Sequence, residues 1–175
     1  IKFSMNKIKS FLETKIFFDQ YLFISIALIS IIGVFFLFSA SQGNFETTIK
    51  QSLFVLLGLI LMFAVSQPDP DFFKNNALIF MLFSIFLVLL TFLIGKEVNG
   101  AKRWLDLGFL TLQSSEIMKI TLPLFLAAYL YNKPLPISLF HTFITLALIL
   151  FSANIVRIQP DLGTSLVILV AGLYI

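Results

Sequence analysis

Six apolar segments, separated by short polar connectors, constrain this chain more than any other feature of its sequence. They occupy residues 21–40, 49–66, 77–95, 117–131 and 139–156, with a sixth beginning near Leu162. A helix needs about 20 apolar residues to cross the hydrocarbon core of a membrane. The first three segments and the fifth have about this length, and the fourth approaches it if its helix begins near Ser115. The sequence therefore predicts an all-α fold, a polytopic transmembrane helix bundle of about six helices.

The composition agrees with a membrane protein and excludes several other classes. Hydrophobic residues make up 59% of the chain and charged residues 12%, whereas soluble domains carry about 25% charged residues. No cysteine is present, which excludes disulfides and thiol chemistry. The net charge of +3 is too small to indicate nucleic-acid binding. We interpret the Lys and Arg residues as topology signals and as contacts for membrane lipids.

Residues 1–20 are predicted to form an amphipathic cytoplasmic tail, followed by a membrane domain over residues 21–175. The tail lacks the small-residue cleavage site of a signal peptide, and its cations are Lys2, Lys7, Lys9 and Lys15. Because cytoplasmic loops are enriched in Lys and Arg, this tail places the N-terminus in the cytoplasm. The connectors at 41–48, 96–116 and 157–161 then face outside, where the cations are Lys96, Lys102, Arg103 and Arg157. Positive charge on that side indicates either a site for an anionic ligand or the opposite orientation.

Polar and charged residues concentrate between Asn99 and Ile120, within an otherwise hydrocarbon-rich sequence. Lys102, Arg103 and Trp104 place two cations beside an aromatic ring, a combination that binds phosphate or pyrophosphate. The alternative is an interfacial anchor, in which the cations reach the headgroups and the ring lies at their level. We therefore predict these three residues as substrate-binding candidates. Glycines at 100 and 108 bracket them and permit tight turns.

Three further residues are candidates for a polar cavity. Glu116 and Lys119 are three positions apart and share a helix face. They either form an ion pair at a helix start or provide a buried carboxylate that Lys119 keeps ionised. Asp161 lies between Pro160 and Gly163 at the start of the sixth segment. It is predicted to cap that helix, to line the outer cavity, or to do both.

Three motifs in this order resemble one family. They are GAKRWLDLG at 100–108, QSSEIMKI at 113–120 and QPDLGTS at 159–165. Together they resemble the N-terminal half of the shape, elongation, division and sporulation (SEDS) family, which includes RodA, FtsW and SpoVE. The sequence WLDLG at 104–108 favours the RodA-type members. On this basis residues 21–175 are identified as the N-terminal portion of a SEDS-type membrane domain.

The resemblance implies a multi-pass protein of the bacterial inner membrane with about ten transmembrane helices. Family members polymerise glycan strands from lipid II, whose disaccharide is linked to undecaprenyl pyrophosphate, and their partner is a class B penicillin-binding protein. RodA-type members serve cell elongation and rod shape. Lys102 and Arg103 would then stabilise the leaving pyrophosphate. Glu116, Lys119 and Asp161 would orient the sugar or a divalent cation, although carboxylate and water ligands leave no spacing signature for such an ion.

Two departures from the family pattern bear on activity. The usual Pro of the second motif is replaced by Ser114, which we expect to make the start of the fourth helix less rigid. The sixth segment is still apolar at Ile175, and a helix that ended within lipid would leave carbonyls unsatisfied, so we expect a truncated chain. The family's essential Asp, the proposed general base, belongs to a later loop. The alternatives to a polymerase are therefore a flippase for lipid-linked precursors and a non-catalytic truncated relative.

Overall fold

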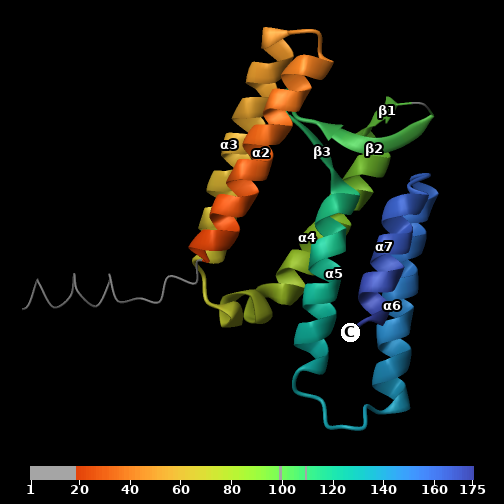
Figure 1. Cartoon of the computed structure of the whole chain (residues 1–175). Coiled ribbons are helices and arrows are strands. Elements are labelled where there is room, and N and C mark those ends of the chain that lie inside the picture. The colour runs from red at the N-terminus through yellow and green to blue at the C-terminus, as the bar shows by residue number, and fades with distance from the viewer. Residues whose placement is uncertain (1–18, 99, 109) are drawn as a thin grey trace, which may run out of the picture. The chain divides into compact units, whose positions relative to one another are not determined.

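A computed structural model describes residues 19–98, 100–108 and 110–175 of the chain. These residues form six helices and three short strands (Figure 1). In chain order the elements are α2 (Gln20–Ala40), α3 (Phe45–Ser66), α4 (Pro70–Ile94), β1 (Lys96–Val98), β2 (Ala101–Asp106), β3 (Thr111–Gln113), α5 (Ser114–Leu130), α6 (Leu139–Ile158) and α7 (Leu162–Leu173). They belong to two compact units, Ile1–Asp69 and Pro70–Ile175. The predicted tail at 1–20 lies almost entirely outside the described residues.

Each of the six predicted apolar segments coincides with a helix. Among the described residues, four helices are long and apolar enough to cross a membrane, namely α2, α3, α4 and α6. These correspond to the first three segments and the fifth, as the sequence predicted. The fourth segment begins at Ser114, one residue from the predicted start. The helical membrane bundle is therefore confirmed, but the strands between α4 and α5 were not predicted.

The first unit is a helical hairpin of α2 and α3. The Asp19 carboxylate caps α2 by accepting hydrogen bonds from the backbone N–H groups of Tyr21 and Leu22. The Asn44 side chain caps α3 through the N–H of Thr47 at 3.1 Å. These caps satisfy donors that a helix start leaves unpaired. No residue of either helix is buried within the described chain.

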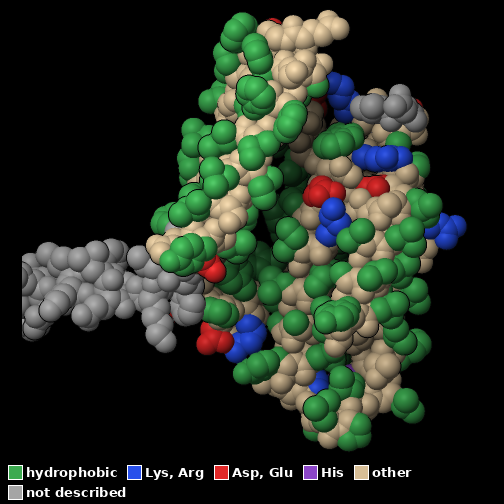
Figure 2. All heavy atoms as spheres, viewed as in Figure 1, with side chains coloured by type: hydrophobic (Ala, Val, Ile, Leu, Met, Phe, Trp, Pro, Cys, Tyr) green, Lys and Arg blue, Asp and Glu red, His purple; other side chains and the backbone are tan. Residues whose placement is uncertain are grey.

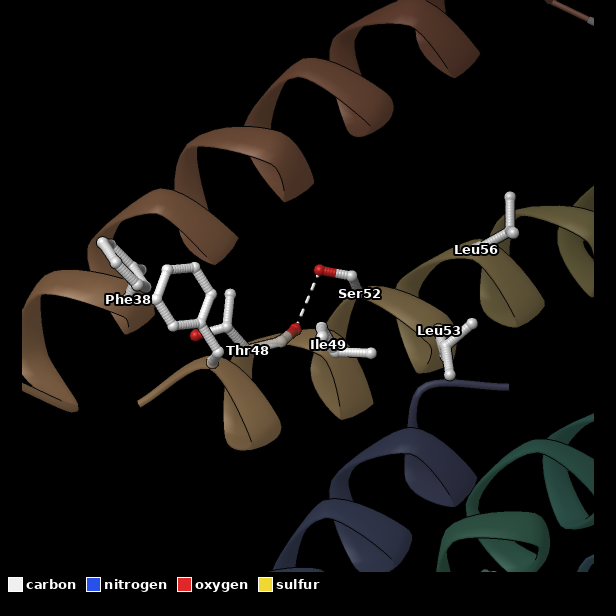
Figure 3. A pocket seen from close by; sticks show the side chains of 7 residues that line it. Phe38, Thr48, Ile49, Ser52, Leu53 and Leu56 are labelled. Atoms are coloured by element: carbon white, nitrogen blue, oxygen red, sulfur yellow. Dashed lines mark hydrogen bonds between the residues drawn. The ribbon is translucent and has the colours of Figure 1, made fainter. Parts of the chain in front are cut away.

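A shallow groove of about 420 Å³ lies between α2 and α3 (Figure 3). Phe38 and Phe45 close one end with their rings 5.2 Å apart, and Ile49, Leu53 and Leu56 line the rest. The polar lining is confined to hydroxyls such as that of Ser52, which donates to a carbonyl of its own helix. The groove therefore presents mainly hydrocarbon.

The second unit contains the core, where α4, α5, α6 and α7 pack together. Its buried apolar residues are Met81, Val88, Met118, Leu122, Leu126, Ile149, Ala153, Val156 and Ile168. Hydroxyl pairs link α4 to α5 within it, because Thr121 donates to Ser84 at 2.8 Å and Thr91 bonds to Ser114 at 3.0 Å. The outer surface is hydrophobic over most of the visible face, and charged side chains are few (Figure 2).

Three antiparallel strands form a small sheet between α4 and α5, in the order β1-β2-β3. Glycines at both turns have positive φ angles, +75° at Gly100 and +87° at Gly108, where other residues are disfavoured. The Asp106 carboxylate accepts from the Gly108 N–H at 2.9 Å and pairs with Lys96 at 3.3 Å. The sheet therefore turns the predicted outer connector into an ordered cover at one end of α4 and α5 (Figure 1).

Candidate functional site

Asp161 lies in the turn between α6 and α7 and receives hydrogen bonds from two directions. Its Oδ1 accepts from the backbone N–H of Thr164 at 3.2 Å, which caps α7. Its Oδ2 accepts from Nε2 of Gln113 at 2.7 Å and from the hydroxyl of Ser115 at 3.1 Å. Asp161 is therefore both a helix cap, as predicted, and the centre of a polar cluster that joins α7 to the start of α5, while its role in lining an outer cavity stays a prediction.

The hydrogen bonds keep the Asp161 carboxylate ionised. Burial by itself would raise the pKa of Asp161, but hydrogen bonds from Thr164, Ser115 and Gln113 outweigh it, and the pKa lies below its ordinary value. Each of these donors stabilises the charged form. The carboxylate is half-buried rather than sealed, so it remains a negatively charged acceptor that a ligand can approach.

Gln113 and Ser115 were not predicted as site residues. They lie on either side of the junction between β3 and α5, and Gln113 Nε2 also donates to the Ser115 hydroxyl at 3.1 Å. The sequence placed both in a polar motif but gave no indication of which helix they would face. Their partner, Asp161, is 46 residues from Ser115 along the chain, and no helical or strand periodicity relates positions that far apart.

Arg103 contacts the turn that precedes Asp161. Its Nε donates to the Gln159 carbonyl at 2.9 Å, and its Nη2 donates to the Pro160 carbonyl. The side chain of Gln159 is itself buried, at 2% exposure, and its Nε2 donates to the Val88 carbonyl at 3.4 Å. The turn is therefore held by β2 on one side and by α4 on the other.

The structure does not bring Lys102, Arg103 and Trp104 together as one binding group. Arg103 is half-buried and its guanidinium bonds to the turn between α6 and α7. Lys102 is exposed without a hydrogen bond or ion pair to the described residues. The pairing of β2 with β1 is irregular at this point, where Lys96 pairs with Trp104 and Glu97 pairs with Lys102, so the side chains need not alternate between the two faces of the strand. The predicted grip of both cations on one phosphate therefore does not follow from this geometry.

Glu116 and Lys119 form the ion pair that their spacing indicated. The Lys119 Nζ lies 2.7 Å from Glu116 Oε1. The Glu116 side chain is 53% exposed and that of Lys119 is 27% exposed. The Glu116 carboxylate is therefore exposed, and the alternative prediction of a buried carboxylate does not hold in the described part of the chain. Among the described residues, neither Glu116 nor Lys119 bonds to Asp161. Ser115, which directly precedes Glu116, does bond to Asp161.

Comparison with known proteins decides the family. Residues 19–175 match the FtsW, RodA and SpoVE family, described as cell cycle proteins. The chain belongs to this family. Its helices and its family together make it a multi-pass membrane protein. The SEDS resemblance of the three sequence motifs is thereby confirmed.

Relatives in this FtsW/RodA/SpoVE family include characterised and solved proteins. Peptidoglycan glycosyltransferase MrdB of Escherichia coli (strain K12) is 36% identical over 133 residues, which are 76% of this chain and 35% of MrdB. The crystal structure of the Thermus thermophilus rod shape determining protein RodA has a TM-score of 0.78 and 30% identity, covering 86% of this chain and 50% of that one.

A chain from a peptidoglycan synthase complex, studied for the coordination of polymerization and crosslinking, has a TM-score of 0.77 and 31% identity. The match covers 87% of this chain and 45% of the other. The present chain thus spans half or less of the length of these three proteins.

No group of three or more His, Asp or Glu side chains that could hold a metal ion occurs among the described residues of this family member. Asp161 is surrounded by neutral donors and acceptors, and Glu116 is paired with Lys119. The divalent cation considered from the sequence stays a prediction.

Proposed function

We propose that the protein containing this chain is a RodA-type peptidoglycan glycosyltransferase, which polymerises lipid II into glycan strands during cell elongation and so maintains rod shape. The observation that carries the proposal is the match to MrdB, a peptidoglycan glycosyltransferase, over 76% of this chain. The polar cluster around Asp161 supports it, since ionised residues in a helical membrane protein are expensive and mark functional sites. Because the match spans only 35% of MrdB, the activity is proposed for the whole protein.

In the proposed reaction a sugar 4-hydroxyl attacks the anomeric carbon of a second substrate, and the bond to undecaprenyl pyrophosphate breaks. The hydroxyl proton passes to a base that the family resemblance assigns to a later loop, and the pyrophosphate leaves with its negative charge. Asp161 offers its ionised carboxylate as an acceptor for sugar hydroxyls. Lys102, on the exposed face of β2 beside Trp104, is suited to stabilise the leaving group. Glu116 and Lys119 extend the polar surface from α5.

The proposed setting is the bacterial inner membrane with the N-terminus in the cytoplasm. This orientation puts the sheet and the α6–α7 turn on the outer side, where glycan strands are needed. A class B penicillin-binding protein is the proposed partner, and the similarity to a chain of a peptidoglycan synthase complex supports this choice.

The test compares Asp161→Asn with Asp71→Asn in the natural gene product, expressed in full with its partner and given purified lipid II. Asp161→Asn removes the charge but keeps the shape, and we expect glycan yield to fall at least about tenfold. Asp71 is a matched control at the far end of α4, where its side chain is 76% exposed and pairs with Lys74. We expect wild-type yield from Asp71→Asn. Unchanged yield in both variants would restrict Asp161 to capping, and lipid II translocation without glycan would favour the flippase.

A further inference from the structure

Arg103 donates hydrogen bonds to backbone carbonyls of the α6–α7 turn. The last carbonyls of a helix have no partner within the helix. α6 ends at Ile158, and Gln159 and Pro160 follow before Asp161. Arg103 supplies donors to the carbonyls of both residues. A guanidinium is suited to this because it presents several N–H groups in one plane and because a cation is favoured at a helix C-terminus.

The contact between Arg103 and the turn joins two distant parts of the sequence, and a nearer arginine does not make it. Arg103 reaches the turn from β2, 56 residues earlier in the chain. Its neighbours in β2 at positions 101 and 105 are buried, and the Arg103 side chain is itself half-buried. Arg157 offers the natural comparison: it lies in the last turn of α6, is exposed, and makes no side-chain hydrogen bond to the described residues. Proximity to the turn alone therefore does not produce the contact.

Asp161 depends on this turn for its position. Its side chain is held by Thr164, Gln113 and Ser115. The backbone just before it is held by Arg103 and by the buried Gln159 side chain, which donates to the Val88 carbonyl of α4. Arg103 forms no salt bridge with Asp161 itself within the described residues. Its influence on the carboxylate therefore passes through the backbone and not through direct charge pairing.

We infer that Arg103 is a positioning residue, which holds the α6–α7 turn so that the Asp161 carboxylate meets the substrate in a fixed place. This inference rests on the proposed function for its catalytic consequence, but not for the contact itself. It differs from the predicted grip on the pyrophosphate, because the bonds that the guanidinium makes in the structure go to the carbonyls of Gln159 and Pro160. A displacement of about 1 Å in a positioned group costs about a hundredfold in rate, so the effect should be large.

The experiment compares Arg103→Ala, Arg103→Lys and Arg157→Ala in the natural gene product with its partner. The first measurement is kcat and KM for lipid II polymerisation. Arg103→Ala should lower kcat at least about tenfold and leave KM within about threefold, since positioning acts on the transition state. Arg103→Lys keeps the charge but has a single donor nitrogen in place of the planar guanidinium, and should recover part of kcat. Arg157→Ala removes the same side chain from an exposed position and should match wild type.

A second measurement does not depend on activity. Amide hydrogen exchange at residues 159–165 should be at least about tenfold faster in Arg103→Ala, because the turn opens more often. If wild-type protein makes no glycan while exchange still rises, the proposed function fails and the positional role stands. A raised KM with unchanged kcat would instead assign Arg103 to the pyrophosphate and overturn the inference, as would unchanged exchange. If Arg103→Ala does not fold, Arg103→Lys is compared with Arg157→Ala in the same two measurements, polymerisation kinetics and hydrogen exchange.

Discussion

Replacing Asp161 by alanine should cost more stability than the loss of a helix cap alone. An N-cap carboxylate is worth about 1 kcal/mol, and Asp161 fills that role for Thr164. The change also removes the acceptor that Gln113 and Ser115 share, although Gln113 keeps its bond to the Ser115 hydroxyl. Because this site is half-buried and water can replace part of the loss, we assign these two bonds about 1 kcal/mol together. The expected total for Asp161→Ala is therefore about 2 kcal/mol, or roughly a thirtyfold change in the local opening equilibrium.

Asparagine at the same position should be much milder. It caps helices about as well as aspartate, and its oxygen can still accept from Thr164. Its amide group would face Nε2 of Gln113, but the Gln113 amide can turn to present its oxygen and the Ser115 hydroxyl can rotate. We expect a loss of about 1 kcal/mol or less for Asp161→Asn. A large fall in polymerisation with this variant would then report lost charge and not lost structure.

The assay is hydrogen exchange at the Thr164 amide, with Asp19→Ala as the matched control. Among the described residues Asp19 bonds only to the start of α2, so exchange at Leu22 should reflect about 1 kcal/mol only. The pKa of Asp161 is lowered in the folded chain, so its contribution is present above the unfolded pKa of about 3.9 and is lost as pH falls through the lower folded value. Equal effects of Asp161→Ala and Asp19→Ala, or of Asp161→Ala and Asp161→Asn, would refute the reasoning.

Two other predictions concern the frame around the site. Gly108→Ala should destabilise the sheet by about 1–2 kcal/mol, because φ is +87° at this position. The control Gly33→Ala adds a methyl group in open space within α2 and should be neutral or stabilising. We expect faster hydrogen exchange of the β2 and β3 amides in Gly108→Ala only. Thr121→Val and Ser84→Ala should show a coupling free energy of about 0.6 kcal/mol in a double-mutant cycle of unfolding in mixed micelles, and purely additive effects would mean that their 2.8 Å bond contributes nothing.

The helices were predictable from the sequence because a membrane imposes one dominant rule. Backbone groups in lipid must bond within their own segment, so a long apolar run becomes a helix. The cap of α7 was predictable for a similar reason, since Asp161 stands between a proline and the first turn of that helix. These are local effects, and each depends on residues a few positions apart.

The sheet and the partners of Asp161 could not be predicted in the same way. β1 and β3 are three residues each, too short to show an alternating pattern. From the sequence we predicted one shared role for Lys102 and Arg103, but in the structure Arg103 bonds to the carbonyls of Gln159 and Pro160 while Lys102 is exposed. Arg103 contacts the turn and Lys102 lies at the exposed surface because this segment forms a strand. No local feature of the sequence indicated that strand.

Ser114, where the motif resemblance leads us to expect a proline, shows how a missing local constraint can be offset by a distant contact. Proline would preset φ at the start of α5, and its absence was expected to loosen that start. Ser114 is fully buried and its hydroxyl bonds to Thr91 at 3.0 Å, which ties the start of α5 to α4. Its neighbours Gln113 and Ser115 bond to Asp161. A proline has no hydroxyl for Thr91, so a serine at this position gives an interhelical bond in place of backbone stiffness, beside the residues that bond to Asp161.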